Sequence, residues 1–325
     1  MVREVKLGKR QSRAELLSNH IAYQTKQGMM IQARAEEALR SHRLQDNYGK
    51  VDLIFTSPPF PLNRKKRYGN LESAEYRHWL AGFAPTFRRL LRRDGSIVIE
   101  MGNAWEPGLP VMSTLALETL LDFLKSGPFY LCQQFVSYNR ARLPSPIQWV
   151  NVERIRVKDA HTHVWWMSPS PRPKANNRRV LLEYSDSMLK LLASKKYNAG
   201  KRPSEYDIGE KSFLRDNSGA IPSSVLPITN TRASDPYLRY CRLHHLSIHP
   251  SRMPRELAEF FVKFLTSPGD LILDPFAGSN VTGAVAEGLD RKWISIEPEK
   301  EYVNGSLGRF PGAKKVALSR HSGRR

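Results

Sequence analysis

The sequence predicts an α/β protein whose sheet is mostly parallel. Segments with the pattern of a buried strand alternate with segments of helical periodicity along most of the chain, as in sheets that are covered by helices. Two predicted strands, at the start of 51–60 and at 271–273, are largely apolar without polar alternation, which is typical of strands buried on both faces. Turns rich in proline or small residues follow both strands. In open α/β sheets, ligands bind at such carboxyl ends.

The composition indicates a folded protein with an anionic partner. The 325 residues are enough for one large α/β domain, or for one domain that carries a sizeable insertion. Lys and Arg number 51 against 31 Asp and Glu, so the formal net charge is +20. This charge favours nucleic acid as the partner, with an anionic membrane surface as the alternative. The chain has no apolar run of about 18 residues, which disfavours the membrane.

The two cysteines, Cys132 and Cys241, form neither a CxxC pair nor a disulfide framework. This usage is typical of the reducing cytoplasm, where we expect the protein to be located. Neither cysteine follows a proline, which bears on the reaction chemistry below. The stretch Cys241-Arg-Leu-His244-His245 matches none of the standard zinc spacings, so we predict no metal site.

Periodicity predicts the elements of the first half. Residues 1–20 are basic and carry little pattern, so we expect a loosely held arm that can contact a phosphate backbone. Good helix formers within 21–48 predict a helix with an apolar stripe through Ile31, Ala35, Ala38 and Leu39. After the 51–60 stretch, the patterns predict a helix over 72–93 that bends near Pro85, a strand over 96–101, a helix over 111–126 and a strand over 129–137.

The second half is less regular. Residues 138–182 are irregular, apart from a strand expected in the HTHVWW stretch. Helical periodicity ends near 192 and the rest of 183–240 is loop-like, which predicts an insertion that reads a partner; a disordered linker is the alternative. The remaining patterns predict a helix over 249–265, a strand over 271–273, a helix over 281–289, a strand over 293–296 and a frayed basic tail from 311.

The first candidate site follows the strand at 51–56. Ser57, Pro58, Pro59 and Phe60 place a hydroxyl, rigid carbonyl groups and an aromatic ring at its carboxyl end. The two prolines lack N–H donors and fix φ, so the strand cannot continue. An ordinary strand followed by a Pro-Pro turn is the alternative interpretation.

Two nearby features extend this site. The loop that follows contains four consecutive cations, Arg64, Lys65, Lys66 and Arg67, which are well placed to hold a phosphate backbone or form a solvated charge run. Glu100 ends the next predicted strand. It either reaches the same crevice or faces solvent, and the sequence leaves both open.

The second candidate site has the pattern of a nucleotide-binding turn. A strand ends at Asp274, a turn of small residues leads into a helix, and Glu297 ends the next strand at close to the roughly 20 positions expected for a ribose-binding carboxylate. There is no G-x-G-x-x-G pattern, so a dinucleotide pyrophosphate is disfavoured. A turn with one glycine suits a cofactor without phosphate groups, such as S-adenosylmethionine.

The motifs DPFAGSN and TSPPF together resemble those of the DNA amino-methyltransferases, the modification enzymes of restriction–modification systems. The Ser-Pro-Pro motif precedes the cofactor motif, an order similar to that of the β-arranged, circularly permuted class. HPSRMP, residues 249–254, resembles the other cofactor motif of that family. The resemblance covers roughly residues 20–310. Serine before Pro-Pro resembles the cytosine-N4 branch, whereas the adenine-N6 branch more often has Asp or Asn.

The resemblance implies a Rossmann-like, S-adenosylmethionine-dependent fold that transfers a methyl group to the N4 amine of cytosine in double-stranded DNA. Adenine-N6 transfer and an inactive DNA-binding homologue are the alternatives. A restriction endonuclease is a functional partner without a stable complex. The implied site comprises catalytic Ser57, Pro58, Pro59 and Phe60, the DNA-binding cations of 64–67, and the cofactor-binding residues Asp274, Pro275, Phe276, Ala277, Gly278, Ser279, Asn280, Glu297 and His249.

The implied organisation assigns 21–182 and 241–310 to two halves of the methyltransferase domain. Residues 183–240 form the target-recognition insertion, and 311–325 the tail. The sequence departs from the family at Asn280, where a second glycine is common. Asparagine tolerates a left-handed backbone better than most residues, so we expect the turn to survive.

Overall fold

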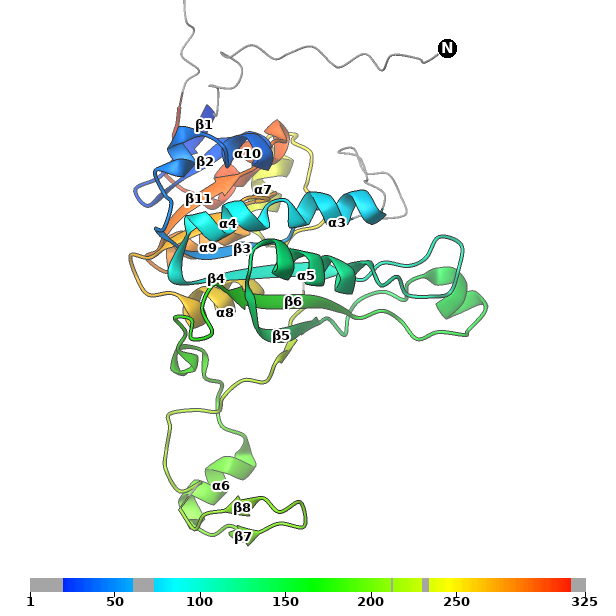
Figure 1. Cartoon of the computed structure of the whole chain (residues 1–325), viewed down its shortest axis with the longest axis vertical. Helices are drawn as coiled ribbons and strands as arrows, with labels where there is room; N and C mark the ends of the chain where they lie inside the picture. The colour runs from blue at the N-terminus through cyan, green and yellow to red at the C-terminus, as the bar shows by residue number, and fades with distance from the viewer. Residues whose placement is uncertain (1–19, 61–72, 212, 230–233, 317–325) are drawn as a thin grey trace, which may run out of the picture.

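The computed structural model describes residues 20–60, 73–211, 213–229 and 234–316, which are arranged around one mixed sheet (Figure 1). The strand order within these residues is β12-β1-β2-β11-β10-β3-β4-β6-β5-β9. The strands are β1 His20–Gln24, β2 Gly28–Gln32, β3 Val51–Thr56, β4 Leu91–Gly102, β5 Tyr130–Tyr138, β6 His161–Ser168, β9 Val225–Pro227, β10 Leu271–Asp274, β11 Lys292–Ile296 and β12 Lys314–Lys315.

The central strands β2, β11, β10, β3 and β4 all run parallel. This confirms the prediction of a mostly parallel α/β sheet. The strands β1 and β6 are antiparallel to their neighbours. All six residues of β3 are buried, as expected for a strand covered on both faces.

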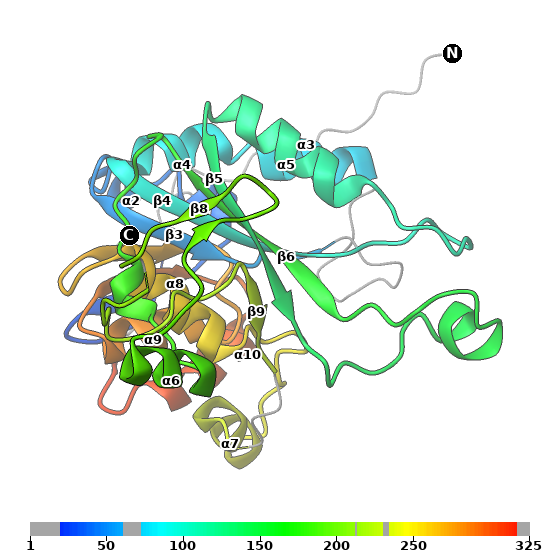
Figure 2. The ribbon, with the colours of Figure 1, turned by 90° about the horizontal axis from the view of Figure 1, so that it is seen from below.

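Helices cover both faces of the sheet, and each face has its own apolar core (Figure 2). One face packs against α3 Ser73–Ala81, α4 Ala84–Leu90 and α5 Leu115–Ser126, with the short helices α1 Ala35–Ala38 and α2 His42–Gln45. The other packs against α8 Arg255–Leu265, α9 Val281–Gly288 and α10 Lys300–Ser306. The predicted bend near Pro85 is a break, because this proline lies in the first turn of α4. No helix within the described ranges is both long and apolar enough to cross a membrane.

The predicted helix within 21–48 is wrong over its first part. Residues 28–32 form β2, which pairs in parallel with β11, and Ile31 is a buried strand residue. Its preference for the sheet is tertiary in origin, because Gly28 lies directly against Trp293, where a Cβ atom would come within 2.3 Å of the indole ring. Only the short helices α1 and α2 remain of the predicted helix. The N-terminal arm lies outside the described residues up to 19.

A segment projects from the body of the protein between Leu182 and Ala220 (Figure 1). It contains α6 Asp186–Ser194 and a small hairpin of β7 Gly200–Lys201 and β8 Asp207–Ile208. The backbones of Leu182 and Ala220 exchange two hydrogen bonds of 2.9 Å, which close its base. Beyond this base, β9 pairs with β5, and α7 Pro236–Leu243 packs against α10.

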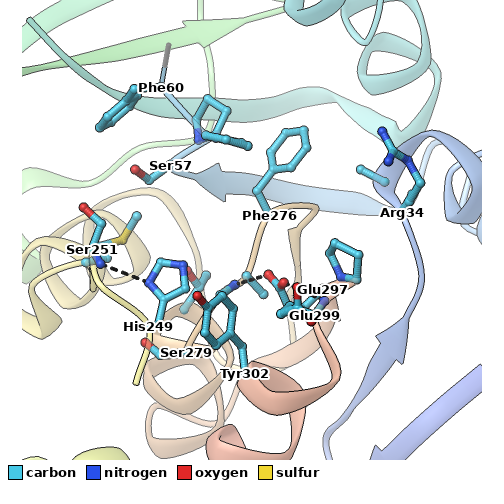
Figure 3. A pocket seen from close by; sticks show the side chains of 18 of the residues that line it. Arg34, Ser57, Phe60, His249, Ser251, Phe276, Ser279, Glu297, Glu299 and Tyr302 are labelled. Atoms are coloured by element: carbon cyan, nitrogen blue, oxygen red, sulfur yellow. Dashed lines mark hydrogen bonds between the residues drawn. The ribbon is translucent and has the colours of Figure 1, made fainter. Parts of the chain in front are cut away.

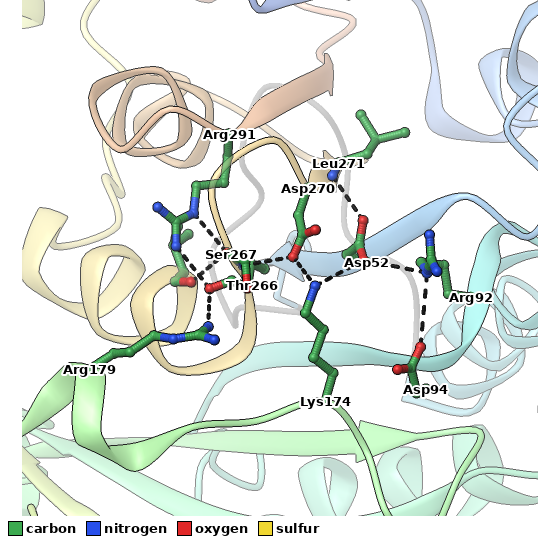
Figure 4. Close-up of polar contacts among 11 residues, drawn as sticks. Asp52, Arg92, Asp94, Lys174, Arg179, Thr266, Ser267, Asp270, Leu271 and Arg291 are labelled. Carbon is green, nitrogen blue, oxygen red and sulfur yellow. Dashed lines mark hydrogen bonds and ion pairs between the residues drawn. The ribbon is translucent and has the colours of Figure 1, made fainter.

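A polar network fixes the chain just before this projecting segment (Figure 4). Lys174 pairs with Asp270, and its Nζ lies 3.6 Å from the buried Asp52 carboxylate. Arg179 donates to the carbonyl oxygen of Thr266. Because these contacts join residues before the segment to the amino-terminal edge of the sheet, they anchor it to the side of the sheet opposite the candidate site.

Candidate active site

The two candidate sites of the sequence lie side by side. They follow β3 and β10, which are neighbouring parallel strands, so both turns emerge from the same edge of the sheet. Ser57, Phe60 and Phe276 line one cavity of about 350 Å³ together with Gly278 and Glu297 (Figure 3). The whole set of predicted residues that line it is Ser57, Pro58, Pro59, Phe60, His249, Phe276, Ala277, Gly278, Ser279 and Glu297.

Three predicted cofactor residues, Asp274, Pro275 and Asn280, do not line this cavity. Asp274 is buried and accepts hydrogen bonds from Thr56 Oγ1 and from the Phe276 amide, so it shapes the turn. Burial raises its pKa to about 6. Any contribution of Asp274 to cofactor binding is therefore indirect, and the binding roles of all three residues stay predictions.

Asn280 adopts the left-handed conformation expected for it, with φ 53° and ψ 48°. Its side chain caps α9 by accepting from the Gly283 amide at 3.1 Å, and it accepts a second hydrogen bond from Ser295. It also donates to the buried hydroxyl of Tyr23. The asparagine therefore holds the turn in place by hydrogen bonds that a second glycine would lack.

Gly278 lets the backbone of the turn pass close to His249. A Cβ atom on Gly278 would lie 2.9 Å from Nε2 of that ring, and φ is +51°. The ring of His249 also packs edge-on against Tyr302 at 4.6 Å, and its Nδ1 accepts a hydrogen bond from the Ser251 amide. The sequence placed His249 at the cofactor site without indicating Tyr302, because no motif marks the start of α10.

Glu297 is buried at the tip of β11 and holds two loops together. Its carboxyl oxygens accept hydrogen bonds from the amides of Gly278, at 2.8 Å, and Glu299, at 2.9 Å. Burial raises its pKa to about 7, and the hydrogen bonds oppose this rise. It lines the cavity, so a ligand hydroxyl group can also reach it.

Glu100 lies beside Ser57 and is buried, so the alternative of a solvent-facing carboxylate is wrong. The hydroxyl of Thr162 donates to Oε1 at 3.0 Å, and the Ser57 side chain also hydrogen-bonds with the carboxyl group. Burial raises the pKa of Glu100, and both hydrogen bonds lower it in part. A hydroxyl group and a proton acceptor are thus adjacent at the cavity.

An aromatic wall completes the cavity, and sequence reasoning missed most of it. Trp79 of α3 packs against Phe276, with ring centroids 5.4 Å apart, and its indole donates to Glu36 at 2.7 Å. Glu36 and Arg34 also line the cavity from the loop after β2. These residues come from elements without a recognisable motif, and only the tertiary fold brings them here.

The predicted cationic loop, Arg64, Lys65, Lys66 and Arg67, lies outside the described residues. Its contact with DNA stays a prediction.

Comparisons with known proteins agree with this geometry. A family model described as "DNA methylase" matches residues 51–307. The type II methyltransferase M.PvuII of Proteus hauseri is 44% identical over 291 residues, which are 89% of this chain and 85% of the relative. The DNA adenine methyltransferase YhdJ of Escherichia coli K12 is 26% identical, over 80% of this chain and 76% of its own.

Solved structures show the same fold. The PvuII DNA methyltransferase, described as cytosine-N4-specific, superimposes with a TM-score of 0.72 at 38% identity and covers 90% of both chains. The DNA modification methylase TTHA0409 of Thermus thermophilus, solved with S-adenosyl-L-methionine, gives a TM-score of 0.52 at 18% identity, over 86% of this chain and 93% of its own. The family model covers more than half of the chain, and M.PvuII exceeds 40% identity over most of both sequences. The chain therefore belongs to the DNA methylase family.

Proposed function

We propose that this protein transfers a methyl group from S-adenosylmethionine to the N4 amine of cytosine in double-stranded DNA. The observation that carries the proposal is the pairing of Ser57 with the buried Glu100 at the mouth of a cavity whose far wall is a nucleotide-type turn. M.PvuII, at 44% identity, supports it, since the structure of the PvuII enzyme is described as cytosine-N4-specific.

The residues of the cavity fit this cofactor. The turn at Gly278 offers close backbone approach without a phosphate-binding glycine pattern, and the Glu297 carboxylate is placed to accept ribose hydroxyls. Phe276 and Trp79 form an apolar wall that suits adenine. S-adenosylmethionine, when bound, supplies an electrophilic methyl group.

The side chains on the other wall activate the amine. The lone pair of the cytosine amine is delocalised into the ring, so the amine is a weak nucleophile. The ionised carboxylate of Glu100 holds the Ser57 proton, which leaves the Ser57 oxygen free to accept an N–H of the base. The Pro58 carbonyl is a second, rigid acceptor. Together they localise the lone pair on nitrogen, and Ser57 and Glu100 take up the proton that the amine loses.

No covalent intermediate with the enzyme is required, which agrees with the absence of a Pro-Cys pair in the sequence. The base must leave the duplex to reach Ser57, and this costs a few kcal/mol. Phe60 stacks on the extruded base beside Ser57. Proximity of the two reacting groups in one cavity then supplies much of the rate.

Adenine-N6 transfer is the second candidate, because YhdJ is described as a DNA adenine methyltransferase. Its identity to this chain is lower than that of M.PvuII, and Ser57 favours cytosine.

Further parts of the proposal concern biological context. We assign sequence recognition to 183–240, chiefly to the segment that projects between Leu182 and Ala220. Methylation protects the same DNA sequence from a restriction endonuclease that forms no stable complex with this protein. The free thiols of Cys132 and Cys241 and the substrate DNA support a cytoplasmic location.

Mass spectrometry of nucleosides from unmethylated DNA, treated with the protein and S-adenosylmethionine, tests the function. N4-methylcytosine is the expected product, and sequencing then maps the recognition sequence. N6-methyladenine would move the specificity to the second candidate. DNA that is bound without any methylated base would contradict the proposal.

A further inference from the structure

Two loops beyond the carboxyl ends of β4 and β5 have no part in the chemistry above. They comprise residues 103–113 and 139–160, and we call them the paired loops. Figure 2 shows them extending away from the edge of the sheet at which β4 ends and β6 begins. The projecting segment of 183–219 leaves the body in a different direction (Figure 1).

The paired loops are braced against each other. The guanidinium group of Arg156, in the second loop, lies 3.7 Å from the ring centroid of Trp105 in the first, and donates to the Pro110 carbonyl at 2.9 Å. Lys158 Nζ donates to the Arg140 carbonyl at 2.7 Å and ties together the two ends of the second loop. The loops are therefore held in a defined shape by their own contacts.

This shape leaves apolar side chains in solvent. Leu143 is 80% exposed and Val157 is 87% exposed. Ile147, Val152 and Ile155 of the same loop are also exposed. A braced loop that buries so little apolar surface of its own is typical of a binding surface.

The charge of the surface selects a polyanion. Residues 139–160 contain five cations, Arg140, Arg142, Arg154, Arg156 and Lys158, against the acidic Glu153 and Asp159. Arg140 and Arg154 are exposed and make no ion pair within the described part of the chain. A second copy of the protein would carry the same net charge of +20 and would be repelled. Duplex DNA is attracted by this surface.

The roots of the paired loops adjoin the reacting groups. Asn103, directly after β4, donates to Asp159 of the second loop at 2.8 Å. The preceding residue, Gly102, lies against the Phe60 ring, to which a Cβ atom would be 3.1 Å away. The charge of Arg142 also acts on Glu100. A base extruded toward Ser57 therefore leaves the duplex beside these loops.

We propose that the paired loops bind duplex DNA next to the extruded base, with Arg140 and Arg154 on phosphate groups and Leu143 and Val157 against the opened base pairs. Apolar side chains play this part in other proteins that unstack DNA. The inference rests on the proposed function. It assigns the loops a role in opening and holding the duplex, separate from sequence recognition by the projecting segment.

The charge contacts are tested with the double variant Arg140→Ala/Arg154→Ala in the full-length protein. The matched control is Lys26→Ala/Lys292→Ala, which removes two exposed cations from the amino-terminal edge of the sheet. Binding to a duplex oligonucleotide with the mapped site is measured by fluorescence anisotropy over a salt series. We expect the loop variant to bind at least tenfold more weakly, with a salt slope reduced by about 0.9 for each lost phosphate contact. The control should bind like the wild type.

The apolar contacts are tested with Leu143→Ser/Val157→Ser. We expect methylation of the paired duplex to slow about tenfold, and to recover when the target cytosine faces a mismatch, because an unpaired base costs less to extrude. Thermal unfolding at the wild-type temperature confirms that the variants are folded.

Two results would overturn the assignment while the wild-type protein still methylates DNA. One is wild-type binding, salt slope and methylation in both loop variants. The other is a wild-type dimer, seen by light scattering, that the apolar variant converts to a monomer without a change in DNA binding. A wild-type protein that binds but does not methylate DNA contradicts the proposed function instead, and the salt slopes still decide on the loops.

Discussion

Thr56 donates a hydrogen bond of 2.7 Å to Asp274, although the two residues are 218 positions apart in the chain. Thr56 directly precedes the proposed catalytic Ser57, and Asp274 opens the cofactor turn. Both groups are fully or nearly fully buried, so the bond is shielded from water. It fixes the spacing between the two halves of the site, and the position of the amine relative to the cofactor depends on that spacing.

Replacing Ser57 by alanine removes the acceptor of the target amine proton. We expect kcat to fall about 100-fold, in the range seen when a single aligned polar group is lost from an active site. Binding of DNA and of S-adenosylmethionine should change little, because the cofactor turn is untouched. Single-turnover kinetics and equilibrium binding separate the two effects, and a variant as active as the wild type would refute the role of Ser57.

Glu100→Gln retains the shape of the side chain but removes its charge. The proposed chemistry needs the carboxylate, whose pKa is raised by burial, so the wild-type rate should fall as the pH drops through that raised pKa. The variant should be slower and should lack this acidic limb. Thr162→Val is the matched test, because it removes a hydrogen bond that lowers the pKa of Glu100 and should move the limb to higher pH. A limb of unchanged position in Thr162→Val, or one retained in Glu100→Gln, would exclude Glu100 as its source.

Gly278→Ala tests the close approach of the cofactor turn. The added Cβ meets His249 at 2.9 Å, and alanine is strained at φ +51°. Gly269→Ala is a matched control, since Gly269 has φ +85° with no atom within 4 Å of the added Cβ. Both variants should lose about 1–2 kcal/mol of stability from backbone strain. Calorimetry should show weaker cofactor binding only in Gly278→Ala, and equal affinity in both variants would contradict our account of the turn.

Glu297 should make the stability of the cofactor-free protein depend on pH. Burial raises its pKa from 4.5 to about 7, so the folded state holds this proton more tightly than the unfolded state. The stabilisation is complete below about pH 4.5 and is lost as the pH rises toward about 7, a change on the order of 3 kcal/mol.

Glu297→Gln removes this titration. The difference in unfolding free energy between wild type and variant, measured by urea denaturation across this pH range, should therefore move against the wild type as the pH rises. A difference that stays constant with pH would show that Glu297 does not titrate there.

The parts of the fold that the sequence predicted are those with local signals. The apolar face of α8 and the Ser-Pro-Pro turn after β3 depend on nearby residues, and the structure reproduces both elements. The strand β2 was missed because its pairing with β11 joins segments far apart in the chain, and its own residues also suit a helix. The antiparallel direction of β6 likewise depends on its neighbours β4 and β5.

The site shows the same division. Gly278, His249 and Glu297 belong to motifs, and all three line the cavity. Trp79 and Tyr302 lack a motif, and only the packing of α3 and α10 brings them to the same cavity. Asn280 was expected at the cofactor, whereas its side chain is used entirely inside the turn, because a buried amide must satisfy its own hydrogen bonds.

The paired backbone hydrogen bonds of Leu182 and Ala220 have a consequence for how such a protein can diversify. They bring the two ends of the intervening stretch together at the surface, so the rest of the chain is indifferent to its length. Each doubling of a flexible loop costs only about 0.6 kcal/mol. A lineage can therefore exchange or lengthen this stretch and acquire a new DNA address, while the residues that perform the reaction are inherited unchanged.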